Sequence, residues 1–164
     1  MTRRLRPVGL DFADTAPVRL VYTARASATP EAVYRALAEE VTGWPDWFRA
    51  VTLARPTGGG AGREVKLMGG VRFQETIMAA DPGQRYAYRV DETNAPGMRA
   101  LLEEWLLTPV GGADSPATLV RWTFACDGPT AFRLALTAAR PALGHSFRTA
   151  VRTLDTRLTT RSGG

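Results

Sequence analysis

The 164-residue sequence predicts a single α+β domain, in which an antiparallel sheet of seven strands curves around a long C-terminal helix. One alternating segment comes first, a helical segment follows, and six more strand-like segments come after it. The connections between these six segments are short, so neighbouring strands should pair antiparallel. An apolar stripe with helical spacing closes the sequence. A long sheet that curls around one terminal helix leaves a gap that side chains do not fill, which predicts a cavity.

The first strand begins at Val18, where apolar and polar residues start to alternate. A helix start follows at Thr29-Pro30-Glu31: threonine caps, proline takes the first helical position, and glutamate faces the positive end of the helix dipole. The apolar stripe of this helix recurs every four residues, at Val33, Leu37 and Val41. Gly43 ends the helix, and Trp44-Pro45-Asp46-Trp47-Phe48 predicts a second short helix or turn.

The six later strands are expected at approximately residues 50–55, 62–68, 71–79, 84–91, 100–109 and 117–126. Glycine, proline, aspartate and asparagine separate them, as in Asp81-Pro82-Gly83. Gly128-Pro129 ends the last strand, and the remainder is typical of helix, with a kink or break forced by Pro141. The stripe of this helix consists of Phe147, Val151, Leu154 and Leu158.

The numbers of cysteine and histidine residues and the lengths of the apolar runs exclude several classes of protein. The single cysteine, Cys126, excludes an internal disulfide framework, and together with the single histidine, His145, it cannot make a four-ligand zinc site. No apolar run approaches the ~20 residues that span a bilayer, and no long apolar segment follows the basic N-terminus. We therefore expect a cytoplasmic protein without an integral membrane segment. Residues 1–16 are expected to form a loose N-terminal arm, and residues 17–160 the domain.

The net charge of +5 does not indicate a nucleic-acid partner. The arginines are scattered among acidic residues rather than clustered, and no nucleic-acid-binding motif accompanies them. Gly58-Gly59-Gly60 does not lead directly into a helix, so it is interpreted as a flexible turn and not as a phosphate loop. We expect no metal and no cofactor.

Three stretches carry a resemblance to a known family. The Trp44-Pro45-Asp46-Trp47 pair follows the first helix, Asp81-Pro82-Gly83-Gln84-Arg85-Tyr86-Ala87-Tyr88 forms a hairpin with an aromatic strand, and Thr118-Leu119-Val120-Arg121-Trp122 forms a later strand. With this order of elements, residues 17 to 160 resemble the START-like (SRPBCC) superfamily, and within it the polyketide cyclase/dehydrase family. The resemblance implies the helix-grip fold and an internal cavity. It offers no catalytic triad that maps onto this sequence.

The apolar pattern also predicts the register of the sheet, because a slip of one residue would send the aromatic residues to the other face. The hairpin at Asp81-Pro82-Gly83 should pair Phe73 with Val90, Glu75 with Tyr88 and Ile77 with Tyr86. The next connection should pair Tyr88 with Glu103 and Tyr86 with Trp105, and the last should pair Glu103 with Phe124 and Trp105 with Trp122. A three-residue loop, Met68-Gly69-Gly70, places Arg63 opposite Glu75 and keeps Val65 with the apolar residues.

This register predicts a polar row across the concave face, made of Arg63, Glu75, Tyr88 and Glu103 and ending at Phe124. Buried carboxylates are costly unless they are paired, so their presence on an apolar face needs a reason. Three interpretations stay open. The row is an internal salt-bridge and hydrogen-bond network, a polar anchor for a ligand carbonyl or hydroxyl, or an acid–base site in which Glu75, Tyr88 and Glu103 are the catalytic candidates.

The expected ligand contacts lie on the inward faces of the strands and are Arg63, Val65, Phe73, Glu75, Tyr86, Tyr88, Glu103, Trp105, Trp122 and Phe124. Trp105 and Trp122 are interpreted equally as core or as cavity wall, whereas Trp44 and Trp47 are interpreted as core residues rather than ligand contacts. His145 is expected to have a surface or packing role.

Ser146 is not surrounded by a nucleophile-elbow pattern, and Cys126 is expected to be an inert apolar residue.

Three classes of function follow from the cavity and the resemblance. The first is binding of a small hydrophobic molecule that is polyketide-, lipid- or isoprenoid-like, by a monomer or homodimer. The second is a polyketide cyclase or dehydratase that uses a carboxylate and a tyrosine as acid and base. The third is a protein-interaction module with a vestigial cavity. A filled core would favour the third, and an open cavity bordered by the polar row would favour the first two.

Overall fold

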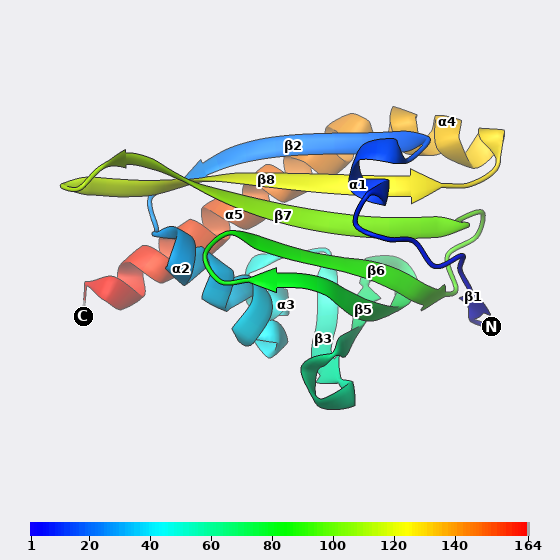
Figure 1. The fold of residues 1–164 in the computed structure, drawn as a ribbon, viewed down its shortest axis with the longest axis horizontal. Coiled ribbons are helices and arrows are strands. Elements are labelled where there is room, and N and C mark those ends of the chain that lie inside the picture. Colours follow the sequence, from blue (N-terminus) through cyan, green and yellow to red (C-terminus); the bar gives the residue numbers. More distant parts are fainter. Residues whose placement is uncertain (164) are drawn as a thin grey trace.

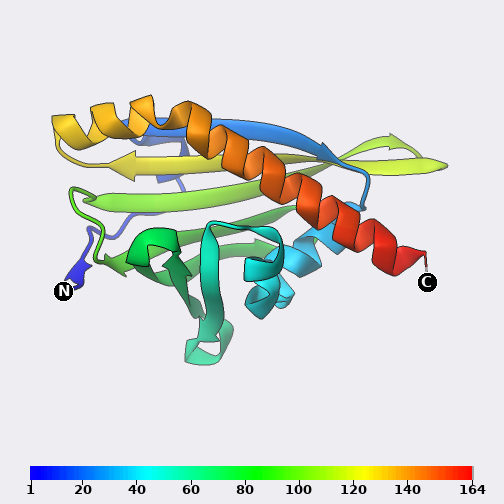
Figure 2. The same cartoon turned by 180° about the vertical axis from the view of Figure 1, so that it is seen from behind.

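The computed structural model describes residues 1–163 and has the predicted α+β architecture, a curved antiparallel sheet with the long C-terminal helix α5 (Arg140–Ser162) on one side (Figure 1). The view from behind shows α5 running obliquely across this side (Figure 2). The strands are β1 (Arg3–Arg4), β2 (Val18–Ala26), β3 (Val51–Thr57), β4 (Gly62–Leu67), β5 (Arg72–Asp81), β6 (Arg85–Thr93), β7 (Ala100–Gly112) and β8 (Ser115–Asp127). They are ordered β2-β8-β7-β6-β5-β4-β3, and β1 pairs with β6. The helix-grip prediction is confirmed, with β1 added to the seven expected strands.

The segment after β2 is helical, as predicted, but it is not one regular helix. Its pieces are α2 (Pro30–Tyr34), the π-helical turn η1 (Arg35–Glu39), the 3-10 turn η2 (Val41–Gly43) and α3 (Trp44–Trp47). The Thr29 side chain accepts a hydrogen bond from the Ala32 amide at 3.3 Å, which confirms it as the cap. Val33, Leu37 and Trp44 are buried, so these turns fold over the sheet and close one end of it.

The C-terminal helical region has the expected break. α4 (Thr130–Ala138) and α5 are separated at Ala139, and Pro141 occupies the first turn of α5, where its missing N–H costs nothing. The stripe of α5 faces the sheet: Phe147 is fully buried, and its ring centroid lies 5.8 Å from that of Trp105 and 5.7 Å from that of Trp122. Packing of α5 onto the aromatic strands therefore fixes one wall of the interior.

The predicted register is confirmed in three of the hairpins. Glu103 pairs with Phe124 and Trp105 with Trp122 between β7 and β8. Tyr88 pairs with Glu103 and Tyr86 with Trp105 between β6 and β7. The short turn η4 (Met68–Gly70) forms the three-residue loop between β4 and β5, so that Arg63 lies opposite Glu75 and Val65 opposite Phe73.

The predicted register of β5 against β6 is wrong. Glu75 pairs with Val90 instead of Tyr88, and Tyr88 pairs with Ile77. Gly83 has a φ of 68°, which forms a three-residue loop between Asp81 and Arg85, and the pairing shifts again at two irregularities in β5. The shift near Glu75 amounts to two residues, which leaves the inward and outward faces unchanged. Glu75 consequently still faces inward, but it is not the direct neighbour of Tyr88.

The interpretation of residues 1–16 as a loose arm is also wrong. Arg3–Arg4 forms β1 and Phe12–Thr15 forms the helical turn α1. Phe12 is buried, with Ala100, Leu102 and Ala125, in a second apolar cluster separate from the main core. In Figure 1, α1 lies over the face of the sheet opposite α5. The alanines on outward positions of β7 and β8 leave the space that this segment fills.

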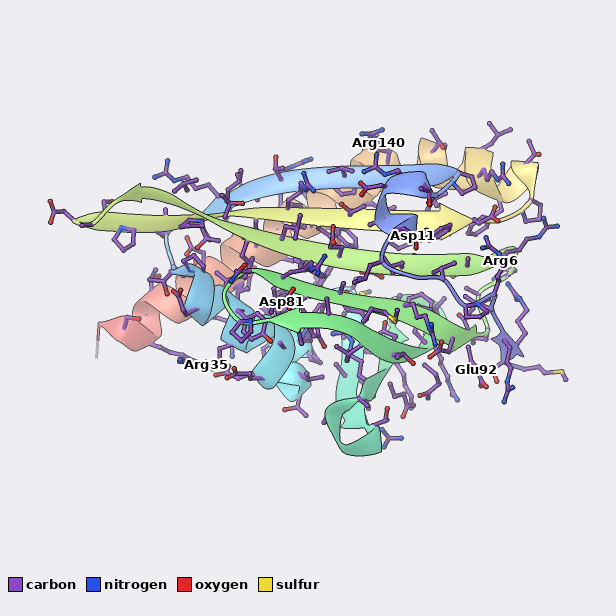
Figure 3. The ribbon with its side chains drawn as sticks, viewed as in Figure 1. Arg6, Asp11, Arg35, Asp81, Glu92 and Arg140 are labelled. Atoms are coloured by element: carbon purple, nitrogen blue, oxygen red, sulfur yellow. The ribbon has the colours of Figure 1, made fainter. Side chains whose placement is uncertain are left out.

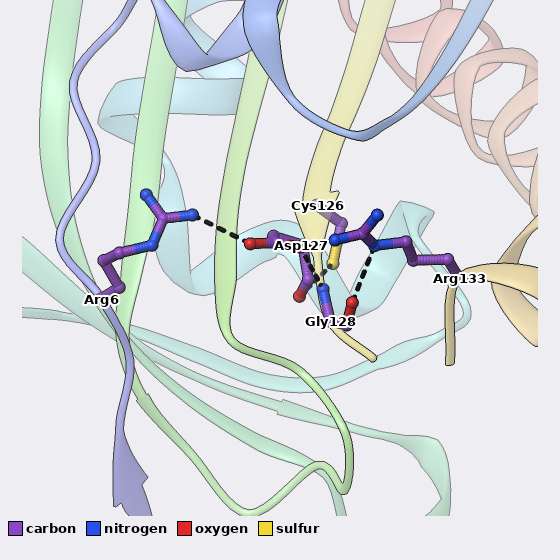
Figure 4. Close-up of polar contacts among 5 residues, drawn as sticks. All are labelled: Arg6, Cys126, Asp127, Gly128 and Arg133. Atoms are coloured by element: carbon purple, nitrogen blue, oxygen red, sulfur yellow. Dashed lines mark hydrogen bonds and ion pairs between the residues drawn. The ribbon is translucent and has the colours of Figure 1, made fainter. Parts of the chain in front are cut away.

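Asp127, the last residue of β8, ties this arm to α4 (Figure 4). Its carboxylate accepts hydrogen bonds from Arg6 Nη2 at 3.0 Å, Arg133 Nη2 at 2.9 Å and the Gly128 amide at 2.7 Å. Burial alone would raise the pKa of Asp127, but these donors outweigh it and lower that pKa. One carboxylate thus joins the end of β8 to the arm through Arg6 and to α4 through Arg133.

Charged side chains are spread around the molecule rather than gathered on one face. Arg6, Arg35 and Arg140 project at widely separated places, and the acidic Asp11, Asp81 and Glu92 lie among the other labelled side chains (Figure 3). Within residues 1–163, no helix is both long enough and apolar enough to cross a membrane.

Candidate functional site

A cavity of about 180 Å³ lies between the sheet and the first half of α5. Its walls are largely apolar and consist of Trp44, Phe48, Ala50, Val51, Arg63, Val65, Leu67, Phe73, Glu75, Tyr88, Glu103, Trp122, Phe124, Leu143 and Ser146. Eight of the ten predicted ligand contacts are among these residues. The other two, Tyr86 and Trp105, are buried but do not line the cavity. Tyr86 instead borders a smaller pocket of about 110 Å³.

Arg63 and Glu75 form a fully buried ion pair in the cavity wall. Arg63 Nε donates to Glu75 Oε2, and the two side chains are 2% and 1% exposed. Burial alone would lower the pKa of Arg63, but the neighbouring Glu75 carboxylate and the Tyr88 and Tyr86 side chains raise it overall. Burial raises the pKa of Glu75, and the Arg63 guanidinium opposes that rise.

Two aromatic rings also hold the Arg63 guanidinium. Its central carbon lies 4.2 Å from the centroid of the Trp44 ring and 3.9 Å from that of the Tyr88 ring, distances at which a cation is attracted to the ring face. Nη1 of Arg63 is buried and has no hydrogen-bond partner among the described residues. The structure therefore immobilises a cation and leaves one of its donor nitrogens unsatisfied.

Glu103 accepts two hydrogen bonds on the same oxygen. Tyr88 Oη donates to Oε2 at 2.8 Å, and Trp122 Nε1 donates to Oε2 at 2.9 Å. Trp105 Nε1 in turn donates to Tyr88 Oη at 3.1 Å. Trp105 thus contributes to the site through its hydrogen bond to Tyr88, although it does not line the cavity itself. The register alone predicted that Tyr88 and Glu103 are neighbours, and these bonds confirm it.

The pKa values of Glu103 and Tyr88 both differ from the ordinary values of these side chains. Burial, and next the nearby Glu75 charge, raise the pKa of Glu103 to about 7, against the opposing effects of the Tyr88 hydrogen bond, Arg63 and the Trp122 hydrogen bond. Burial likewise raises the pKa of Tyr88 well above its ordinary value, so the phenol keeps its proton and acts as a donor. Glu103 can therefore exchange a proton near neutral pH, which is a requirement for an acid–base residue.

Glu103→Gln should make the free energy of unfolding less sensitive to rising pH. The folded protein holds the Glu103 proton more tightly than the unfolded chain, so this stabilisation is complete below about pH 4.5 and is lost as the pH rises through about 7. Glutamine keeps the acceptor for Tyr88 and Trp122 but does not ionise. The stability of the variant relative to wild type should increase by about 3 kcal/mol between pH 4.5 and about pH 8.

Urea titrations of both proteins across this pH range measure the difference. Because every other group is common to the two proteins, a difference that does not change with pH would show that Glu103 has an ordinary pKa.

Several cavity residues were not predicted. Leu143 and Ser146 lie one turn and one residue before Phe147 on α5, and the helical period places all three on adjoining positions, so the stripe could have been extended to them. Trp44 was interpreted as a core residue, and it is both buried and part of the wall. Phe48 follows α3, and no sequence pattern indicated its direction.

The remaining interpretations concern residues outside the wall. Trp47 is buried against Trp44, with ring centroids 4.7 Å apart, as a core residue should be. His145 is exposed on α5. Burial raises the pKa of the Cys126 thiol to about 12, so that the residue stays a protonated, inert thiol.

An antiparallel sheet that grips a C-terminal helix and encloses a largely apolar cavity defines the START-like class of helix-grip proteins. Solved structures of other proteins share this fold, and two of them illustrate it. A START superfamily protein from Mycobacterium smegmatis aligns with a TM-score of 0.67 and 10% identity, over 87% of this chain and 97% of that one. The Zhui aromatase/cyclase from a Streptomyces species aligns with a TM-score of 0.71 and 20% identity, over 90% of this chain and 98% of that one.

The chain belongs to the family described as polyketide cyclase/dehydrase and lipid transport, whose model matches residues 17–159. It is also similar to an uncharacterized protein of Mycobacterium tuberculosis, with 30% identity over 152 residues that cover 90% of this chain and 88% of the relative. The sequence resemblance is thereby confirmed for the family.

Proposed function

We propose that the protein binds a small, mainly apolar molecule in the cavity between the sheet and α5. The observation that carries this proposal is the cavity itself, a space of about 180 Å³ with apolar walls onto which Arg63, Glu75, Tyr88 and Glu103 converge. An apolar cavity of about 150 Å³ holds a benzene molecule, so this space suits a ligand, or part of a ligand, of the size of a substituted benzene. An open cavity does not favour the third class of function, a protein-interaction module whose cavity is vestigial.

Binding should be blocked by filling the cavity from α5. Ser146→Phe adds an aromatic ring where Ser146 lines the wall, whereas His145→Phe adds the same ring to the exposed neighbouring position. Titration of ¹⁵N-labelled wild-type protein with α-methylstyrene should shift the indole N–H signals of Trp44 and Trp122 saturably. Ser146→Phe should weaken this binding by at least about tenfold, because a filled site has no room for the ligand.

The control, His145→Phe, should bind like wild type. An absence of any saturable shift in the wild-type protein, or equal binding by Ser146→Phe, would count against the cavity as the binding site. Native mass spectrometry of the protein purified from its own host would then identify the natural ligand.

A second candidate function, acid–base catalysis on the bound ligand, is favoured by Glu103. Its carboxyl has a pKa of about 7 and borders the cavity beside the Tyr88 hydroxyl. Enolisation of a ketone, a step common to cyclisation and dehydration chemistry, removes a proton from the carbon next to the carbonyl and places one on the oxygen. A carboxylate that is half ionised at neutral pH is suited to remove the first proton.

Acetophenone in D₂O tests this second function, because enolisation replaces its methyl protons by deuterium. The wild-type protein should accelerate the exchange at neutral pH, and Glu103→Gln should slow the catalysed rate by about 10²-fold or more. Proton NMR of the methyl signal measures both rates. His145→Gln, which removes an exposed ionisable group, is the control and should exchange like wild type. Equal rates with Glu103→Gln would leave binding as the function.

A further inference from the structure

We infer that the turn between β4 and β5 docks the protein on a bilayer that contains anionic phospholipids. The turn has an apolar tip, made of Leu67, Met68 and Val71, and two cations at its base, Lys66 and Arg72. It adjoins the cavity, because Leu67 also belongs to the cavity wall. The inference assigns a partner surface, and it holds whether or not the cavity takes the ligand proposed above.

The first step is the exposure of the tip. Met68 is 59% exposed and lies in η4 with Gly69 and Gly70, which are exposed as well. The Met68 amide donates to the Ala50 carbonyl at 2.9 Å, and Nδ2 of Asn94 donates to the Gly70 carbonyl at 3.0 Å. The backbone of the turn is therefore anchored, while its one long apolar side chain extends into solvent. A single exposed methionine needs no explanation by itself, so the charges around it decide its meaning.

The second step is an unfavourable arrangement of positive charge at the base of the tip. Lys66 and Arg72 lie directly opposite each other in the β4–β5 register, and like charges in such positions destabilise a strand pair. Lys66 Nζ is 3.9 Å from Glu64 Oε1, but the Glu64 carboxylate also accepts a hydrogen bond from Arg55 at 2.6 Å. A negatively charged partner surface would turn the repulsion between the two cations into attraction.

A third cation flanks the tip. Arg49 is exposed, and it precedes Ala50, whose carbonyl binds the Met68 amide. Within residues 1–163, neither Arg49 nor Arg72 forms an ion pair. The apolar tip is thus surrounded by positive charge that the protein itself leaves uncompensated.

A bilayer fits both features of the turn. Cations are attracted to anionic headgroups, and an apolar side chain between them reaches the boundary with the acyl chains. Methionine is flexible and adapts its shape to such a medium. An acidic protein surface would pair with the cations but would offer the Met68 side chain no apolar medium. Docking through the tip would also bring the Leu67 part of the cavity wall next to the lipid.

Sedimentation with vesicles tests the inference. One set of vesicles contains phosphatidylcholine alone, and the other contains equal parts of phosphatidylcholine and phosphatidylglycerol. The wild-type protein should sediment with the mixed vesicles and stay in solution with the neutral ones. Because salt screens the attraction, binding to the mixed vesicles should weaken as the salt concentration rises. A protein that does not sediment with the mixed vesicles would overturn the inference.

A pair of double variants locates the contact. Lys66→Gln/Arg72→Gln should weaken binding to the mixed vesicles by about 30-fold, since each cation near an anionic membrane contributes about fivefold. Arg25→Gln/Arg121→Gln is the control, because it removes the same charge from exposed positions on β2 and β8. These strands lie at the other end of the sheet from β3, β4 and β5 (Figure 1), so the control should bind nearly as well as wild type. An equal loss in both variants would show that net charge, rather than the turn, attracts the protein, and would overturn the inference.

Insertion of the tip is tested by Met68→Ser, which should weaken binding to the mixed vesicles by about tenfold or more. Leu119→Ser, on β8, is the matched control and should bind like wild type. None of the replaced side chains is buried, and a cooperative urea transition establishes that each variant is folded. If Met68→Ser bound as tightly as wild type, the tip would not enter the bilayer and the inference would be wrong.

Discussion

Replacing Glu75 by glutamine should lower the free energy of unfolding by about 3–5 kcal/mol, because it leaves the Arg63 guanidinium buried without its counter-ion. Both side chains of this pair are almost completely excluded from solvent. An arginine side chain keeps its proton in proteins even without a counter-ion, so the guanidinium cannot escape by becoming neutral. Removing Glu75 also removes a negative charge that raises the pKa of Glu103, so ionised Glu103 should offset part of the loss above neutral pH.

Urea unfolding at two pH values measures this loss. Asp81→Asn is the matched control, since Asp81 lies on the same strand, β5, and the side chains of its ion pair with Arg85 are 50% and 35% exposed, which makes that pair worth about 1 kcal/mol or less. Arg63→Met/Glu75→Gln should recover most of the stability that Glu75→Gln loses. A single variant as stable as the double variant would mean that the Arg63–Glu75 pair is solvated in solution. Ligand affinity must be measured separately from melting, because Glu75 also lines the cavity.

Trp122→Ala should cost about 3–5 kcal/mol, the range for removing a large aromatic side chain from a core. The Trp122 ring is 4% exposed, and its centroid lies 5.6 Å from that of Trp105 and 5.7 Å from that of Phe147. Its indole N–H donates to Glu103, so the substitution removes a hydrogen bond to a buried carboxyl as well as packing surface.

Leu119→Ala is the control for this substitution, because Leu119 belongs to the same strand, β8, but is 38% exposed. Removal of an exposed side chain should change stability by about 0.5 kcal/mol or less. A loss below about 1 kcal/mol for Trp122→Ala in a denaturant titration would contradict its inward placement.

The β7–β8 part of the sheet was predictable because its alternation is regular. Trp105 and Trp122 lie on inward positions of this alternation, the turn is tight, and the pairing runs without irregularity from Ala100 to Gly112. The β5–β6 pairing was not predictable in the same way. One irregularity leaves Asp91 of β6 without an opposite residue and the other leaves Met78 of β5 without one. The two shifts are opposite in sense and cancel along the hairpin, so the apolar pattern did not reveal them.

The residues of the candidate site that lie on strands were predictable from the sequence, whereas those on non-repetitive segments were not. Arg63, Glu75 and Glu103 are polar residues on inward strand positions, and this contrast with their apolar neighbours identified them. Phe48 lies on a non-repetitive segment whose direction depends on tertiary packing, and so escaped the analysis of periodicity. The orphaned Nη1 of Arg63 depends on side-chain conformation, which no pattern of residue types records.

The packed arm extends the folded unit beyond the residues that the family model matches. The family match starts at residue 17, yet Phe12 and Ala13 cover Ala100, Leu102 and Ala125 on the outer face of the sheet. A recombinant fragment trimmed to the family boundary would present this apolar surface to solvent, and it would also lose the Arg6 contact to Asp127. Exposed apolar patches on sheets promote self-association. Expression and crystallisation should therefore retain the arm, because residues that precede the family match cover part of the sheet.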